Sequence, residues 1–171
     1  MNSINQIQKL INDLNARSAG IILKSDLNSR YPVIQTSKEN LLSLLGQLNE
    51  TLELKFDFLE CITGLDTNQD IEVIYQLLSA DFTFRLNVKV IIERHQLDLP
   101  SVCSIWAGAS YFELELMEML GLRFIDHPSP KALLLPEDWV GHPLRKDYSF
   151  PEFYHGVEHR RVHSRLEHER P

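Results

Sequence analysis

Residues 82–92, Phe-Thr-Phe-Arg-Leu-Asn-Val-Lys-Val-Ile-Ile, decide the fold class of this chain. Apolar side chains occupy every second position, and threonine, arginine, asparagine and lysine fill the first four positions between them. Successive side chains of a strand point to opposite faces of a sheet. The alternation therefore predicts a long strand with one buried face and one mostly polar face.

The stretches 54–58 and 71–77, which precede it, alternate in the same way and predict two more strands. Between these two stretches, Gly64 and the polar residues 66–70 predict a turn. Because the links are short, we expect a largely antiparallel sheet. Two short apolar pieces predict further extended segments: residues 21–23 and 31–35.

Helical spacing of apolar residues marks three segments: residues 3–17, about 37–50, and a region that opens at Pro100-Ser101. Thr36 and Glu39 form a capping-box pattern before the second helix, and Gly121 suits the end of the third. The fold class is therefore α+β: a mostly antiparallel sheet of about four strands packed with helices, plus an extended irregular C-terminal arm.

Composition excludes several classes of protein. A chain of 171 residues that is 43% hydrophobic can bury one core. Cys61 and Cys103 are too few for a disulfide framework or a four-thiolate cluster, so we expect ordinary buried thiols. The net charge of −7 argues against nonspecific binding of nucleic acid. We expect a soluble intracellular protein, because the chain has neither a membrane-spanning apolar run nor a signal peptide.

Motifs for nucleotide binding, serine hydrolysis and HExxH zinc binding are absent from the sequence. The sequence therefore predicts no catalytic, cofactor-binding or metal-ligating residue. One alternative stays open for His155, His159 and His163, whose spacing of four would align them for zinc or nickel on a helix. The other interpretation is a solvated segment in which neighbouring arginines disfavour a cation.

The chain changes in composition near residue 122. Residues 1–122 carry 9 basic and 16 acidic side chains, whereas residues 123–171 carry 8 of each. Six of the eight prolines and six of the seven histidines lie in the second part. We therefore expect an α+β globular body over 1–122 and a proline- and histidine-rich C-terminal segment over 123–171. Since a segment with few local contacts gains order by docking, we expect it to act as a docking arm.

Residues 136–148 are dense in charged and aromatic side chains. Three interpretations stay open: a surface turn held by local ion pairs, an anion site made of His142, Arg145 and Lys146, or a docking segment.

The third predicted helix carries Glu113, Glu115 and Glu118 although most of its surface is apolar. Buried carboxylates need cationic partners. We expect Glu115 to pair with Arg145 or Lys146. The candidate cations for the helix as a whole are Arg123, Lys131, Arg145 and Lys146.

Residues 113–148 resemble the signature of the C subunit of the bacterial respiratory NADH–quinone oxidoreductase, complex I, and the order of elements upstream is similar too. Leu114 replaces an arginine of the family pattern, and Ala132 replaces a basic residue. The residues that carry the resemblance are Glu113, Glu115, Gly121, His127, Pro128, Trp139, Gly141, Pro143, Leu144, Arg145, Lys146, Asp147 and Tyr148.

The resemblance implies a non-catalytic structural subunit of the peripheral arm of a proton-pumping complex. In that complex, FMN and iron–sulfur clusters of other subunits pass electrons from NADH to quinone. It implies no cofactor on this chain, contacts with the D subunit of the quinone site and the cluster-bearing B and I subunits, and a place on the cytoplasmic side of the membrane. One alternative is the equivalent subunit of a related membrane-bound hydrogenase. Another, from a different class, is a free-standing enzyme that uses residues 142–146 on an anionic substrate.

Overall fold

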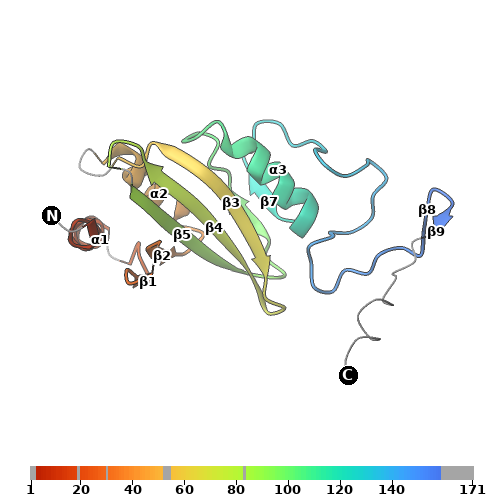
Figure 1. Ribbon diagram of the computed structural model, residues 1–171, viewed down its shortest axis with the longest axis horizontal. Coiled ribbons are helices and arrows are strands. Elements are labelled where there is room, and N and C mark those ends of the chain that lie inside the picture. Colours follow the sequence, from red (N-terminus) through yellow and green to blue (C-terminus); the bar gives the residue numbers. More distant parts are fainter. Residues whose placement is uncertain (1–2, 19, 30, 52–54, 83, 159–171) are drawn as a thin grey trace, which may run out of the picture.

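The computed structural model describes residues 3–158 except 19, 30, 52–54 and 83. Its centre is a five-stranded sheet (Figure 1). In spatial order the strands are β1 (Lys24–Asp26), β2 (Val33–Thr36), β5 (Phe84–Glu93), β4 (Asp70–Ser79) and β3 (Phe58–Asp66). Only the β2–β5 pair of this sheet is parallel. The α+β class and the mostly antiparallel sheet are confirmed, with five strands in place of about four.

The core lies on one face of the sheet. In β4 every second residue from Ile71 to Ser79 is buried, and β5 is buried at Leu86, Val88, Val90 and Ile92, as the alternation predicts. Helix α1 (Ser3–Arg17) and helix α2 (Leu41–Glu50) contribute their apolar sides to the same cluster of buried side chains.

The predicted capping box is wrong, and α2 begins at Leu41, later than expected. The hydroxyl of Thr36 donates to the carbonyl oxygen of Ile21 at 2.6 Å, so it joins β2 to the preceding segment. Asn40 takes the N-cap position without a side-chain bond to the helix, and its Nδ2 donates instead to the carbonyl oxygen of Gly20 at 3.4 Å.

Two strands are shifted from their expected positions. The first lies at Lys24–Asp26 because Ile21, only 2% exposed, is drawn into the core. β3 begins at Phe58, where the predicted strand over 54–58 ended, and Gly64 lies inside it. The turn is confirmed only at the polar residues after Asp66, which join β3 to β4.

Gly64 lies in β3 at a position where a helix packs closely against the strand. It pairs with Val73 of β4, so the two residues face the same, buried side of the sheet. A Cβ at Gly64 would lie 2.9 Å from Leu116 and would collide with Leu120, both on helix α3 (Ala109–Leu120). The absence of a side chain thus lets α3 approach β3 closely.

Helix α3 is shorter than predicted, since it begins at Ala109 and not near residue 100. Residues 98–100 instead form β6 (Asp98–Pro100), which pairs in parallel with β7 (Arg123–Ile125). The predicted end is confirmed: Gly121 is left-handed, with φ 72°, and its N–H donates to the carbonyl oxygens of Leu116 and Met117.

Beyond β7 the C-terminal segment runs outside the sheet, past α3, as an irregular chain (Figure 1). It ends, within the described residues, in a hairpin of β8 (Phe153–Tyr154) and β9 (Val157–Glu158). Among the described residues, every helix is too short or too polar to span a lipid bilayer.

Replacing Gly64 by alanine should destabilise the chain by about 1–3 kcal/mol, because the methyl group would push against Leu116 and Leu120. Gly46, inside α2, has open space around its Cα and is the matched control. Its replacement by alanine should stabilise the chain by about 0.5–1 kcal/mol, since glycine disfavours helix interiors. Urea unfolding measures both, and equal effects of the two changes would contradict the close approach of α3.

Candidate functional site

Glu113 joins α3 to the loop before it. Its side chain is 0% exposed, and its Oε1 accepts the N–H of Val102 at 2.7 Å. The thiol of Cys103 lies 3.6 Å from Oε2 and donates to it. Burial raises the pKa of Glu113 above its usual range, although these donors and nearby His127 oppose the shift. In the described part of the chain, none of the four cations expected to neutralise the helix forms an ion pair with this carboxylate.

His127 connects the segment after β7 to α3. It is 8% exposed, and its Nε2 lies 3.1 Å from the Oγ of Ser110 and 3.3 Å from the carbonyl oxygen of the same residue. Its Nδ1 accepts the N–H of Ser129, just past Pro128, at 3.2 Å. Because a main-chain N–H can only donate, the proton of the neutral ring sits on Nε2 and points to Ser110.

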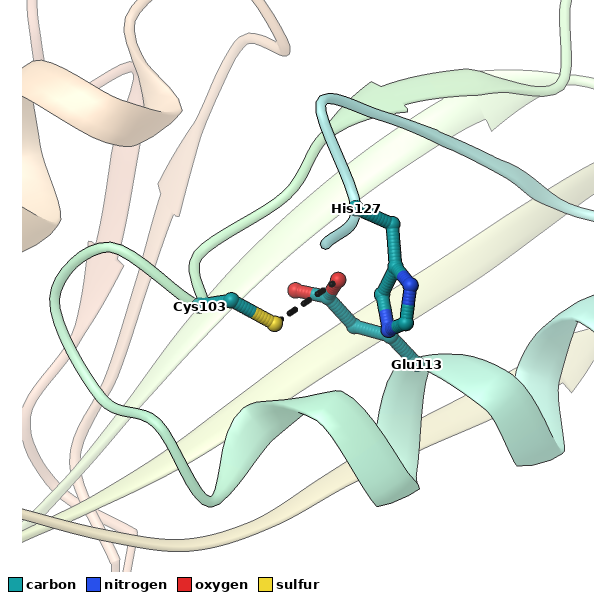
Figure 2. A group of neighbouring side chains, drawn as sticks. All are labelled: Cys103, Glu113 and His127. Atoms are coloured by element: carbon teal, nitrogen blue, oxygen red, sulfur yellow. Dashed lines mark hydrogen bonds between the residues drawn. The ribbon is translucent and has the colours of Figure 1, made fainter. Parts of the chain in front are cut away.

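Within the described residues, Cys103, Glu113 and His127 form a group that could approach a metal ion, since their ligand-type atoms lie within 4.8 Å of one another (Figure 2). A metal-binding imidazole usually presents a lone pair on one nitrogen and donates the N–H of the other. In His127 the nitrogen near the cluster carries the proton, and the outer one accepts. The arrangement therefore suits a hydrogen-bond network that ties three segments together better than a metal site.

Both cysteines are free and half-buried, whereas we expected buried thiols. Burial raises the pKa of Cys103, and the carboxylate of Glu113 adds to the shift. Its thiol is therefore protonated at neutral pH and serves as a donor.

Glu118 holds the loop that follows β7. Its carboxylate accepts the N–H groups of Leu133, Leu134 and Leu135 at 2.7, 2.7 and 3.3 Å. Its main-chain carbonyl oxygen lies 2.8 Å from the Nδ1 of His142. Main-chain donors again replace the expected cations, because a loop laid along the helix brings N–H groups that need acceptors.

The expected pairing of Glu115 with Arg145 or Lys146 is wrong. Glu115 is exposed on the outer side of α3 and, within the described residues, it forms no ion pair. Arg145 instead donates from Nε to the carbonyl oxygen of Leu120 at 2.7 Å. Arg123, another candidate cation, pairs with Asp98 across the β6–β7 pair.

The end of α3 is the first contact between the body and the distal part of the C-terminal segment. A Cβ on Gly121 would lie 2.5 Å from the Nε2 of His142 and 2.8 Å from the Nη2 of Arg145. The guanidinium group of Arg145 therefore covers the last carbonyl groups of the helix, where the helix dipole is negative. One residue earlier in the helix, the carbonyl oxygen of Met119 accepts the N–H of Leu144 at 3.0 Å.

A second contact centres on Asp66, at the end of β3. Asp66 is 3% exposed, and it accepts the N–H of Lys146 at 2.9 Å, the N–H of Asn68 at 2.8 Å and the Nη1 of Arg94 at 3.0 Å. The other end of the Arg94 guanidinium pairs with Asp147 at 2.8 Å. Burial acts to raise the pKa of Asp66, but these donors outweigh it and hold the pKa below its usual range.

Sequence reasoning placed Asp66 only in a turn and did not single out Arg94. Lys146, the partner of Asp66, lies 80 residues further along the chain, and Asp147, the partner of Arg94, lies 53 residues further along. The polar turn gave no signal of either contact.

An aromatic cluster stiffens the last part of the segment. The rings of Trp139 and Tyr154 are 5.3 Å apart, and those of Tyr148 and Phe150 are 5.1 Å apart. Gly141, with φ 85°, leaves room for the ring of Tyr148, since a Cβ on Gly141 would lie 2.8 Å from the Cε2 of Tyr148. Gly141 and Tyr148, two residues of the family motif, therefore contribute to the packing of this segment.

The same segment exposes a set of large apolar side chains, while Pro143 is half-buried. Among the described residues, Val140 is the most exposed of them, at 84%. Exposed apolar groups gathered on one segment mark interaction surfaces. We call this set the apolar arm surface; its members are Leu133, Leu134, Val140, Leu144, Phe150, Phe153 and Val157.

The anion site, one of the three interpretations left open for residues 136–148, is not assembled. His142 and Arg145 are engaged with main-chain carbonyl groups of α3, and the side chain of Lys146 is exposed. His155 lies in the β8–β9 turn, and not on a helix, whereas His159 and His163 fall outside the described residues.

Comparison with known proteins agrees with the motif. The family described as the 30 kDa subunit of respiratory-chain NADH dehydrogenase matches residues 34–154. The C subunit of the NADH-quinone oxidoreductase of Moorella thermoacetica is 34% identical over 149 residues, which is 86% of this chain and 93% of that protein.

Two solved structures share the fold. A trypsin-resistant fragment of Nqo5 aligns with a TM-score of 0.60 at 22% identity, covering 72% of this chain and 98% of the fragment. A chain of an archaeal membrane-bound sulfane sulfur reductase aligns with a TM-score of 0.66 at 16% identity, covering 84% of this chain and 86% of that one.

Replacing Asp66 by asparagine should lower the free energy of unfolding at neutral pH by about 1–3 kcal/mol, because Arg94 and two N–H groups lose a charged acceptor. The pKa of Asp66 is lowered in the folded chain. Its contribution is therefore complete above the unfolded value, about 3.9, and is lost as the pH falls through the lower folded value.

Urea unfolding at several pH values tests this. The difference in free energy of unfolding between wild type and Asp66→Asn should be constant near neutral pH. It should become smaller once the pH drops below about 4. Asp81→Asn, at an exposed position, is the control and should change stability by less than about 0.5 kcal/mol. A gap that does not narrow in acid would show that the charge of Asp66 is not what stabilises this contact.

Proposed function

The chain belongs to the family of the 30 kDa subunit of respiratory-chain NADH dehydrogenase, and we propose that it is a non-catalytic structural subunit of the peripheral arm of a proton-pumping NADH–quinone oxidoreductase. In this role it binds neighbouring subunits and carries no flavin, iron–sulfur cluster or quinone ligand. Electrons pass from NADH to quinone through FMN and iron–sulfur clusters held by those neighbours.

The observation that carries the proposal is the form of the C-terminal segment. It is attached to the body at Glu118, at Gly121 and at Asp66, yet the side chains of the apolar arm surface are exposed. A segment that only closed the core would bury those side chains. One that is held in shape while exposing them suits docking onto another protein. Residues 123–171 are therefore the docking arm in this proposal.

The hydrogen-bond pattern supports a structural role for the motif residues. Glu113, Glu118, His127, His142 and Arg145 all bind loop or main-chain groups of this same chain. Groups engaged in this way position backbone segments and are not free to transfer protons to a substrate. The motif thus shapes the surface on which partners bind.

The partners in this proposal are the D subunit, which holds the quinone site, and the cluster-bearing B and I subunits. A rigid scaffold matters there, because electron transfer between cofactors depends steeply on distance. The chain is peripheral to the membrane through its complex and lies on the cytoplasmic side.

The alternative is the equivalent subunit of a related membrane-bound hydrogenase complex. Leu114 favours this alternative, because a buried apolar side chain, only 2% exposed, stands where the family pattern has an arginine. Purification of the native complex separates the two: a nickel–iron large subunit in the preparation would favour the hydrogenase, and flavin with NADH oxidation the oxidoreductase.

Replacing Val140 by glutamate should lower the amount of assembled complex at least about tenfold, because a charge would enter the docking interface. The isolated variant should unfold at the wild-type urea concentration, since the side chain is 84% exposed. Leu23→Glu, at a residue 54% exposed on the body, is the matched control and should assemble normally.

Affinity purification of each tagged variant from its native host, followed by quantification of co-purified subunits, measures assembly. Equal recovery of partners with Val140→Glu and with Leu23→Glu would contradict docking through the apolar arm surface.

A further inference from the structure

A cleft of about 500 Å³ lies where Trp139 meets the β8–β9 hairpin. Its walls include the side chains of Trp139, Phe153 and Tyr154, and its polar groups include the carboxylate of Asp138 and the imidazole of His155. In the part of the chain that the structure describes, the contacts at Glu118, Gly121 and Asp66 that attach the segment to the body lie outside this cleft.

The carboxylate of Asp138 is held in a defined position. Its Oδ1 accepts the hydroxyl of Tyr154 at 2.9 Å, and its Oδ2 lies 2.7 Å from the Nε2 of His155. The hydrogen bonds from Tyr154 and His155 lower the pKa of Asp138, so the group is ionised at neutral pH. Each carboxylate oxygen has two lone pairs, so the group can accept a further hydrogen bond.

The hairpin turn is built around this contact. Tyr154 pairs with Val157, so the turn consists of His155 and Gly156, with φ 49° and 77°. Positive φ at both positions is typical of a type I′ turn, in which asparagine and glycine are favoured. Histidine adopts this conformation only at a cost. Its bond to Asp138 offsets that cost, and the turn in return fixes the carboxylate at the cleft.

Aromatic faces and negative charge meet in this cleft. The rings of Trp139 and Tyr154 lie 5.3 Å apart at 59°, so they form an angled wall. Among the described residues that line the cleft, Asp138 is the one acidic residue, and none is lysine or arginine. A guanidinium group fits both features, since it binds a carboxylate with two parallel N–H groups and stacks on aromatic rings.

We propose that this cleft binds an arginine side chain of a neighbouring subunit and so selects the partner of the β8–β9 hairpin. The identity of the partner as a subunit rests on the proposed function; the preference for a guanidinium group rests on the cleft alone. The two are therefore tested separately.

The first experiment uses the full chain with Trp106→Phe, which leaves Trp139 as its only tryptophan. N-acetyl-arginine amide is titrated while tryptophan fluorescence is recorded, and the neutral isostere N-acetyl-citrulline amide is titrated in parallel. A saturable change is expected with the arginine probe. Binding should be at least about tenfold weaker for the citrulline probe, and for Asp138→Asn with the arginine probe.

Glu152→Gln, at an exposed acidic residue beside the hairpin, is the control and should bind the arginine probe as wild type does. Urea unfolding of each variant checks that the fold is retained. Equal binding of the two probes, or unchanged binding by a folded Asp138→Asn, would overturn the proposal.

The second experiment places a photoreactive benzoylphenylalanine at Phe153, which is 62% exposed, in the assembled complex. The expected product joins this residue to an arginine-containing peptide of another subunit. A crosslink to residues 159–171 of the same chain, or to a peptide without arginine, would overturn the proposal while the complex still assembles. Failure of the wild-type chain to assemble with any subunit would instead refute the proposed function.

Discussion

The left-handed glycine at the end of α3 is the constraint on which the rest of the C-terminal half depends. Gly121 ends the helix, and the space where its Cβ would lie contains His142 and Arg145. Any side chain there would separate the distal segment from the body. The approach of α3 to β3 is set in the same way by Gly64, so two glycines fix the helix on one side and the segment on the other.

Two of the three acidic residues of α3, Glu113 and Glu118, serve to satisfy main-chain groups. The loop before the helix and the loop after β7 both lie along it without forming secondary structure of their own. Their N–H groups need acceptors, and Glu113 and Glu118 supply them. A charge-assisted bond to several N–H groups stabilises a loop without a second buried charge, whose desolvation would be costly.

These two features together explain how an irregular segment can present a defined surface. Hydrogen bonds and one ion-pair chain through Arg94 hold its backbone, so its side chains need not fold back into a core. The apolar arm surface and the acidic aromatic cleft at Asp138 then lie on a backbone whose conformation these contacts fix. A docking surface held before its partner arrives loses less entropy on binding than a disordered one.

Strands β4 and β5 and the C-terminal end of α3 could be predicted from local patterns, because burial of alternate side chains and the conformational freedom of glycine act over a few residues. The 113–148 motif likewise indicated the family. The contacts of Asp66 with Lys146, and of Arg94 with Asp147, could not be predicted, since they join residues far apart in sequence. The partners of the glutamates were misjudged for the same reason. Sequence shows that a carboxylate needs a donor, but only the packing of loops against α3 decides that a main-chain N–H, and not an arginine, reaches it.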